Sequence, residues 1–144
     1  MKEPVEESRL RVLVVDDEDG VRAFIARALM SAGFVTETAA SGDEALLAIA
    51  HGRFDLVISD VRMPVMSGPK FVETLRRSES GMKVLYLTGY EDQLFTERGV
   101  LWEDEAFLEK PCTIKGLIES VNLLLYGHLE PPTPQHGFFG NLLH

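Results

Sequence analysis

Short apolar runs of strand length recur along the chain, and each is followed by polar or charged residues. Continuous runs of this kind are typical of strands that are covered on both faces of a sheet. Five segments are predicted to be strands on this basis, although the second alternates only loosely. They are residues 12–15, 34–39, 54–60, 84–87 and 106–109.

Apolar residues at helical spacing fill the intervals between these strands. The pattern predicts five helices: one after Gly20, one after Ser41, and others at about 69–77, 92–98 and 113–126. The helix at 92–98 has few apolar residues, which favours a mobile or partner-facing element. The side chains expected to face the core are Val21, Phe24, Ile25, Ala28 and Leu29 in the first helix, Leu46, Ile49 and Ala50 in the second, Phe71, Val72 and Leu75 in the third, and Ile114, Leu117, Ile118, Val121, Leu124 and Leu125 in the last.

Helix-end signals agree with these boundaries. Ser41 and Glu44 have the spacing of a capping box, in which the two side chains satisfy free amides at the start of a helix. Gly127 stands where the last helix is expected to end. Glu18 and Asp19 are expected to be first-turn acids that the helix dipole favours.

Alternation of five strands with five helices predicts an α/β fold, with a parallel sheet, right-handed crossovers and helices on both faces. For this chain length we expect the flavodoxin-like, doubly wound order 2-1-3-4-5. In that order the third strand lies between the first and the fourth. The polar residues at the carboxyl ends of the strands therefore converge, and these are Asp16, Asp17, Asp60, Thr88 and Lys110.

Such a pocket has a definite chemistry. Three carboxylates in a small space raise one another's pKa unless a cation is bound, and Mg²⁺ suits them because it takes oxygen ligands and keeps several waters. With Mg²⁺, the Lys110 ammonium and the Thr88 hydroxyl, the pocket suits a phosphoryl group. Asp60 is then a nucleophile able to form an aspartyl phosphate. Taken singly, Asp60 could equally cap a turn, and Asp16 and Asp17 could be loop acids without a function.

Together these residues resemble a response-regulator receiver domain of two-component phosphorelay signalling, and the resemblance covers residues 10–126. The motifs are the acidic pair Asp16-Asp17, the acceptor segment Asp60-x-x-Met63-Pro64-x-Met66-x-Gly68, Thr88 at the end of the fourth strand, and Lys110-Pro111 at the end of the fifth. Each motif alone is a weak to moderate signal, whereas their combination in this order is highly specific.

The resemblance implies a role for each matching position. Asp60 is the expected phosphoacceptor, and with Asp17 it should bind Mg²⁺ through side-chain oxygen atoms. The backbone carbonyl of Arg62 should contribute a further ligand, while Asp16 should orient a metal-bound water. Lys110 should bind the phosphoryl oxygen atoms. Mg²⁺ is therefore the expected cofactor.

The resemblance also implies a switch. The Thr88 hydroxyl should turn toward the phosphoryl group while the Phe107 ring moves inward, which reshapes the face made by the fourth helix, fifth strand and fifth helix. That face is the expected output, and a homodimer through it is an open alternative. Phe107 is also expected to be a core aromatic residue. The peptide bond between Lys110 and Pro111 is expected to be cis.

Two positions that vary in the family are expected to set rates. Arg62 lies two residues after the acceptor, and Tyr90 lies two residues after the switch threonine. Both flank the route that an attacking water would use. We expect their bulk to slow the loss of the phosphoryl group.

Composition narrows the classes of partner. The chain has 144 residues, 45% of them hydrophobic, which suffices for one domain with a core. A net charge of −9 argues against direct binding of nucleic acid, because that requires clustered Lys and Arg. No signal-peptide core and no stretch long enough to cross a bilayer is found, so we expect a cytoplasmic protein without a membrane partner. Residues 1–9 are expected to form an N-terminal extension, and residues 127–144 a tail or linker.

Several functional alternatives remain at this point. The leading one is a phosphoacceptor that receives its phosphoryl group from a histidine kinase or a histidine phosphotransfer protein and signals to a downstream protein, and it is not an enzyme. It could stand alone or belong to a hybrid kinase. The alternatives are an interaction module that is not phosphorylated and, less favoured, an aspartyl-phosphate phosphatase, whose Asp-x-Asp motif the pair Asp16-Asp17 does not match.

Overall fold

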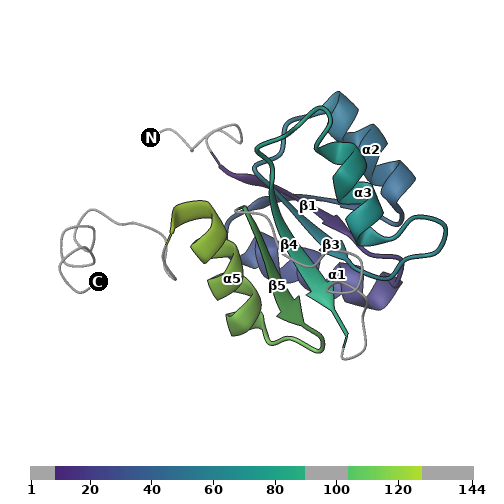
Figure 1. Ribbon diagram of the computed structural model, residues 1–144. Coiled ribbons are helices and arrows are strands. Elements are labelled where there is room, and N and C mark those ends of the chain that lie inside the picture. The colour runs from purple at the N-terminus through teal and green to yellow at the C-terminus, as the bar shows by residue number, and fades with distance from the viewer. Residues whose placement is uncertain (1–8, 90–103, 128–144) are drawn as a thin grey trace.

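The computed structural model describes residues 9–89 and 104–127 (Figure 1). A central sheet carries helices on both of its faces. In chain order the elements are β1 (Arg11–Val15), α1 (Asp19–Ser31), β2 (Val35–Ala39), α2 (Gly42–His51), β3 (Leu56–Asp60), α3 (Gly68–Leu75), β4 (Lys83–Thr88), β5 (Glu105–Glu109) and α5 (Ile114–Tyr126). Strands and helices alternate as the sequence predicts, except between β4 and β5, where residues 90–103 lie outside the described part of the chain.

Within the described residues, five parallel strands form one sheet in the order β2-β1-β3-β4-β5. This confirms the predicted order and the α/β class. Four of the five predicted helices are present in the same part of the chain. The helix predicted at 92–98 lies outside the described residues, as do Tyr90 and the segment 128–144.

The strands β1, β3 and β4 are buried on both faces, because successive side chains point to opposite sides of a sheet that helices cover on both faces. In β1, Leu13 and Val15 pack in the core layer that includes residues of α2 and α3. Val12 and Val14 pack in the opposite layer, with residues of α1 and α5 (Figure 1). β3 is buried along its whole length. The two layers therefore hold the sheet firmly and fix the polar residues that follow its strands.

Side-chain caps mark the starts of α2, α3 and α5. The Ser41 hydroxyl accepts a hydrogen bond from the Glu44 amide at 3.1 Å, and the Glu44 carboxylate accepts one from the Ala40 amide at 2.8 Å. The pair acts reciprocally as its capping-box spacing predicts, although Glu44 reaches the residue before the cap. Ser67 and Thr113 cap α3 and α5. The helices in the described residues fall short of the length and apolar character that crossing a bilayer requires.

Four side chains that the sequence places in the core are exposed instead. Phe24 is 39% exposed because the apolar stripe of α1 is wider than the strip of helix that the sheet covers. Ile114 is 54% exposed at the first position of α5, before the helix meets the core, and Ala50 lies exposed in the last turn of α2. Phe107 is 43% exposed because it belongs to β5, the edge strand.

A buried ion pair fastens the amino end of β5 to the residue that ends α3. The Arg76 guanidinium donates to Glu105 Oε2 at 2.9 Å, and the two side chains are 5% and 0% exposed. Arg76 also donates to the main-chain oxygen atoms of Ser80 and Met82 at 3.1 and 2.8 Å. These bonds tie the edge strand and the turn before β4 to one side chain.

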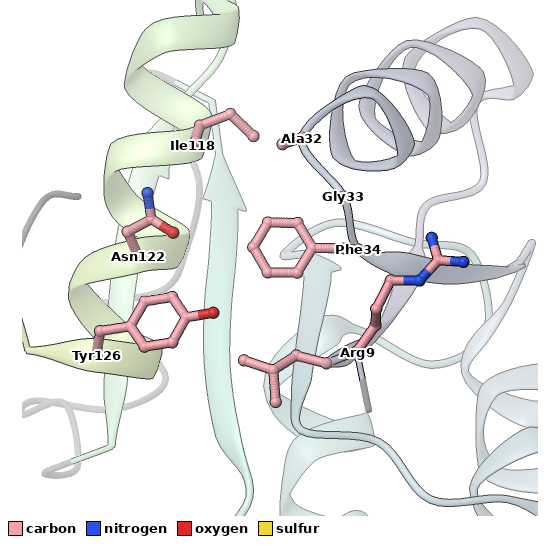
Figure 2. Close-up of a pocket in the computed structure, with 8 residues that line it drawn as sticks. Arg9, Ala32, Gly33, Phe34, Ile118, Asn122 and Tyr126 are labelled. Atoms are coloured by element: carbon pink, nitrogen blue, oxygen red, sulfur yellow. The ribbon is translucent and has the colours of Figure 1, made fainter. Parts of the chain in front are cut away.

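A cavity of about 370 Å³ lies between α5 and the segment that joins α1 to β2 (Figure 2). The Phe34 ring enters it from one side, and the Asn122 and Tyr126 side chains enter it from α5. Arg9 and Leu10, which precede β1, complete its wall. The cavity therefore lies near the amino ends of β1 and β2, at the opposite edge of the sheet from the converging polar residues.

Candidate functional site

The register of the strands brings the predicted site residues to one edge of the sheet. β1 and β3 pair so that Asp16 and Asp60 follow side by side. The register of β4 places Thr88 one step beyond Asp60, and that of β5 places Lys110 one step beyond Thr88. All four stand at the carboxyl ends of the strands, where ligands bind in open α/β sheets.

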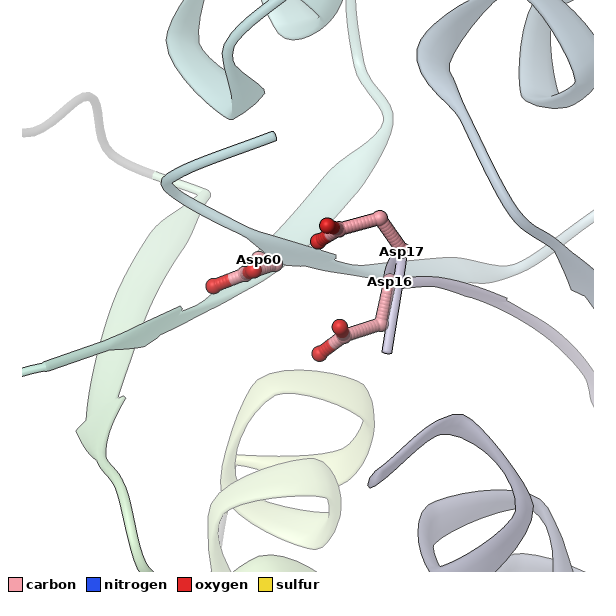
Figure 3. A group of neighbouring side chains, drawn as sticks. All are labelled: Asp16, Asp17 and Asp60. Atoms are coloured by element: carbon pink, nitrogen blue, oxygen red, sulfur yellow. The ribbon is translucent and has the colours of Figure 1, made fainter. Parts of the chain in front are cut away.

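Three carboxylates meet at this edge. Asp16, Asp17 and Asp60 each present a carboxylate oxygen within 4.8 Å of the others. Figure 3 shows that the first two come from the segment after β1 and the third from the end of β3. Asp16 and Asp60 are buried, whereas Asp17 is exposed. The structure therefore gathers the acidic residues that the sequence singles out.

Lys110 supplies the positive charge of the site. Its Nζ lies 3.1 Å from Asp60 Oδ1, 3.8 Å from Asp16 Oδ2 and 3.7 Å from Glu18 Oε1. The first of these distances is short enough for a direct hydrogen bond, and the other two are not. The peptide bond between Lys110 and Pro111 is cis. The lysine that follows β5 therefore lies within hydrogen-bonding distance of the carboxylate that ends β3.

Burial and mutual repulsion disfavour ionisation of the acidic pair. Burial raises the pKa of Asp60 to about 6, and the Asp16 charge adds to the increase while Lys110 opposes it. Burial also raises the pKa of Asp16, against a hydrogen bond from the Glu18 amide and the Lys110 charge. Burial lowers the pKa of Lys110, but the bond to Asp60 and the nearby carboxylates outweigh it, so that this pKa is raised. A further cation would therefore stabilise the ionised pair.

Asp16 shows most directly that the residues fit Mg²⁺. Its main-chain amide donates to the Ala39 carbonyl at 3.1 Å, and its Oδ1 accepts a hydrogen bond from the Glu18 amide at 2.9 Å. Its Oδ2 is buried and accepts no hydrogen bond from the described residues. A buried carboxylate oxygen without a donor is costly, and a cation or a water bound to it would remove that cost. The donor atoms of the cluster are all oxygen, as Mg²⁺ prefers.

The residues predicted to act in switching and in setting rates are placed as follows. Thr88 is buried at the end of β4, and its hydroxyl donates to the Gly89 carbonyl at 2.9 Å. Phe107 lies on the neighbouring strand with its ring exposed. Arg62 is exposed in the segment after Asp60, and Tyr90 lies outside the described residues.

Two neighbours of the acidic cluster were not predicted. Glu18 approaches Lys110 instead of only favouring the start of α1, a contact that cannot be seen without the strand order. Arg22 donates to the Asp16 main-chain oxygen at 2.8 Å and to Asp19 Oδ1 at 2.6 Å. The three-residue spacing of Asp19 and Arg22 on a helix is the sequence signal that could have indicated the second bond.

The chain after Asp60 folds back closely upon it. The Gly68 amide donates to the Val61 carbonyl at 2.8 Å, and a Cβ atom at Gly68 would overlap the Asp60 carbonyl oxygen. Between them, Val65 adopts a left-handed backbone with φ 71° and a fully exposed side chain. Glycine is therefore required at the first position of α3 for that helix to start against Asp60.

The chain belongs to the family of response regulator receiver domains. The sequence model of that family matches residues 12–122, a range that includes the acidic cluster, Thr88 and Lys110. Receiver domains are signalling modules of two-component systems, not classical enzymes, and their partners are histidine kinases. The recognition made from the sequence motifs is thereby confirmed.

Curated relatives include both kinases and regulators. The sensor kinase CckA of Brucella abortus is 39% identical over 116 residues, which cover 79% of this chain and 12% of CckA. The transcriptional regulatory protein PrrA of Mycobacterium tuberculosis is 34% identical over 115 residues, which cover 80% of this chain and 49% of PrrA. The chain thus spans at most about half the length of these relatives.

Solved structures with the same fold include proteins of about the size of the matched segment. The chemotaxis protein CheY4 of Vibrio cholerae has a TM-score of 0.74 and 34% identity, covering 81% of this chain and 99% of its own. The receiver domain of the hybrid histidine kinase CckA has a TM-score of 0.68 and 38% identity, and the match covers 80% of this chain and 98% of that domain's chain. The response regulator TrrA of Thermotoga maritima, in complex with Mg²⁺-BeF, has a TM-score of 0.69 and 33% identity, and the match covers 81% of this chain and 99% of the TrrA chain.

Proposed function

We propose that this protein is a phosphoacceptor, in which Asp60 receives a phosphoryl group from a phosphohistidine of a histidine kinase or a histidine phosphotransfer protein. The observation that carries the proposal is the convergence of three carboxylates within 4.8 Å, with the Lys110 ammonium 3.1 Å from Asp60. Family membership and the Mg²⁺-BeF complex of TrrA support it.

The acidic residues would hold Mg²⁺. We assign direct side-chain ligation to Asp17 and Asp60, a further ligand to the Arg62 backbone carbonyl, and contact through a bound water to Asp16. The buried, undonated Oδ2 of Asp16 supports this last assignment. The bound ion would supply positive charge that offsets the carboxylates and the incoming phosphoryl oxygen atoms.

The side chains of this domain position the reacting groups. An Asp60 carboxylate oxygen forms the new bond to phosphorus while the bond from phosphorus to the histidine nitrogen of the donor breaks. Lys110 Nζ lies 3.1 Å from Asp60 Oδ1, close enough to bind a phosphoryl oxygen in place of its present bond to Oδ1. Thr88 supplies a hydroxyl donor from the adjacent strand.

Thr88 and Phe107 form the proposed switch. The Thr88 hydroxyl donates a hydrogen bond to the Gly89 carbonyl and would turn toward the phosphoryl group. Phe107 is 43% exposed and would move inward as the hydroxyl leaves, changing the surface around β5 and α5. This surface would bind the downstream protein, and a homodimer through it remains a prediction.

The domain limits 10–126 and the cytoplasmic location also remain predictions.

Arg62 and Tyr90 are proposed to slow the loss of the phosphoryl group by screening it from water. Arg62 is exposed and lies two residues after Asp60, which is consistent with that role. Dephosphorylation of Arg62→Gly and Tyr90→Ala should be faster than that of the wild type, and unchanged rates would refute the idea.

Binding of beryllofluoride tests the proposed phosphoryl site without a kinase. We expect calorimetry to show that the wild type binds beryllofluoride when Mg²⁺ is present, and that Asp60→Asn does not. Chelation of Mg²⁺ should abolish binding to the wild type. Equal binding by Asp60→Asn, or no binding by the wild type, would instead favour an interaction module that is not phosphorylated.

A further inference from the structure

Arg22 joins the two ends of the acidic loop, which comprises residues 16–19. Its Nη1 donates to the main-chain oxygen of Asp16 at 2.8 Å, and its Nη2 donates to Asp19 Oδ1 at 2.6 Å. Its main-chain amide donates to the Glu18 carbonyl at 2.9 Å. Asp17 lies between the two residues that the guanidinium contacts, one through its main-chain oxygen and the other through its side chain.

The two side-chain bonds of Arg22 differ in environment. Asp19 is 90% exposed, and an exposed ion pair of this kind contributes little by itself. The Arg22 side chain is 19% exposed, and its bond to the Asp16 main chain is partly buried. A guanidinium presents several N–H groups in a fixed plane, so it can hold both acceptors at once. The bridge therefore depends on the shape of arginine as well as on its charge.

Arg22 also leaves the ligand atoms of the acidic cluster available. It donates to a main-chain oxygen of Asp16 and to Asp19, which is not a member of the three-carboxylate cluster. Asp16 Oδ2 still accepts no hydrogen bond from the described residues. The arginine is thus placed to shape the loop without neutralising the oxygen atoms that face the site.

We propose that Arg22 is a positioning residue that holds the acidic loop in the shape required for cation binding. This inference rests on the proposed function, because it assumes that the cluster binds Mg²⁺. A loop that is already ordered loses little conformational freedom when the ion binds, so the affinity of the site for Mg²⁺ is higher. Removing a residue that orients the metal ligands commonly lowers metal affinity by about 10- to 100-fold.

Titration calorimetry with Mg²⁺ tests the proposal on the full chain. Arg22→Lys keeps the charge but loses the planar fork, and Arg22→Gln loses the charge as well. We expect both variants to bind Mg²⁺ about tenfold more weakly than the wild type. Arg27→Lys and Arg27→Gln are matched controls, because Arg27 is exposed on the same helix, and they should bind as the wild type does.

The sign of the change separates positioning from simple electrostatics. If Arg22 acted only as a nearby positive charge, Arg22→Gln would bind Mg²⁺ more tightly and Arg22→Lys would be unchanged, which would overturn the proposal. Wild-type affinity in both variants would overturn it as well. A wild type that binds no Mg²⁺ would refute the proposed function, and this inference with it.

Amide hydrogen exchange of the metal-free protein gives a readout that does not depend on the ion. The Glu18 amide donates to Asp16 Oδ1, so it reports whether the loop keeps its shape. We expect faster exchange at Glu18 in both Arg22 variants, while amides in β3 keep wild-type protection. Unchanged exchange at Glu18 in Arg22→Lys would contradict the proposal, even if Arg22→Gln failed to fold.

Discussion

At the scale of single residues, Asp60 links stability to the chemistry of the site. Its pKa rises from 3.8 to about 6 because it is buried, next to Asp16. A carboxyl group with a higher pKa in the folded state binds more protons when folded than when unfolded. Its contribution to stability is therefore present below about pH 4 and is lost as the pH rises through about 6.

Replacing Asp60 by asparagine should consequently stabilise the metal-free protein at neutral pH. A rise of about two pKa units corresponds to about 2–3 kcal/mol, so Asp60→Asn should raise the free energy of unfolding at pH 7 by about 2 kcal/mol. The difference should become small near pH 4, where Asp60 is protonated in the folded state. Urea unfolding at both pH values, with chelator present, measures it. The exposed Glu73→Gln is the control, and a less stable Asp60→Asn at pH 7 would contradict the electrostatic description.

At the scale of elements, the start of α3 is tied to the acceptor by a glycine. Gly42 and Gly68 are each the first residue of a helix, which makes them a matched pair. A Cβ at Gly68 would overlap the Asp60 carbonyl oxygen, whereas one at Gly42 would meet the end of the flexible Met66 side chain. The obstacle is rigid in the first case and movable in the second.

Gly68→Ala should therefore destabilise the protein by about 1–3 kcal/mol, since overpacking against backbone forces a shift. It should also weaken Mg²⁺-dependent beryllofluoride binding, because the end of β3 carries Asp60. Gly42→Ala should change both quantities much less. Urea unfolding and calorimetry test the pair, and equal effects of the two substitutions would show that the close approach at Gly68 is not limiting.

The edge strand β5 depends on its buried ion pair. Removing Glu105 would leave the Arg76 guanidinium buried without its carboxylate partner, which typically costs about 3–5 kcal/mol. Asp104 is the control, because it forms a half-exposed pair with Lys83 at 3.5 Å and such pairs contribute at most about 1 kcal/mol. In urea unfolding, Glu105→Ala should thus be far less stable than Asp104→Ala. Similar stabilities would mean that the buried pair does not hold the edge.

At the scale of the whole molecule, the α/β class could be predicted from the alternation of apolar, strand-length runs with helical stretches, and the strand order from the flavodoxin-like topology expected for this chain length. A buried parallel sheet requires apolar runs, and the polar residues that end those runs must then meet at one edge. The exposure of apolar side chains at the boundary of the core could not be predicted in the same way. Phe24 and Phe107 have the pattern of core residues, but how far the sheet covers them depends on the packing of neighbouring elements.

The contacts between the acidic loop and other elements also could not be predicted from the sequence. The approach of Glu18 to Lys110 depends on where the end of β5 lies relative to α1. The bond from Arg22 to the main chain of Asp16 depends on the direction in which the loop turns. Residue types and spacing specify neither contact. The ligand candidates Asp16, Asp17 and Asp60 stand out in the sequence because the first two form an acidic pair after an apolar run and the third ends one.

The most direct test of phosphorylation at Asp60 is the intact mass of the protein after incubation with acetyl phosphate and Mg²⁺. We expect one phosphoryl adduct on the wild type, none on Asp60→Asn, and none when a chelator replaces Mg²⁺. That result would establish the acceptor and its dependence on the metal together. An adduct that persists in Asp60→Asn, or a wild type that remains unmodified while it binds Mg²⁺, would contradict the assignment of Asp60 as the phosphoacceptor.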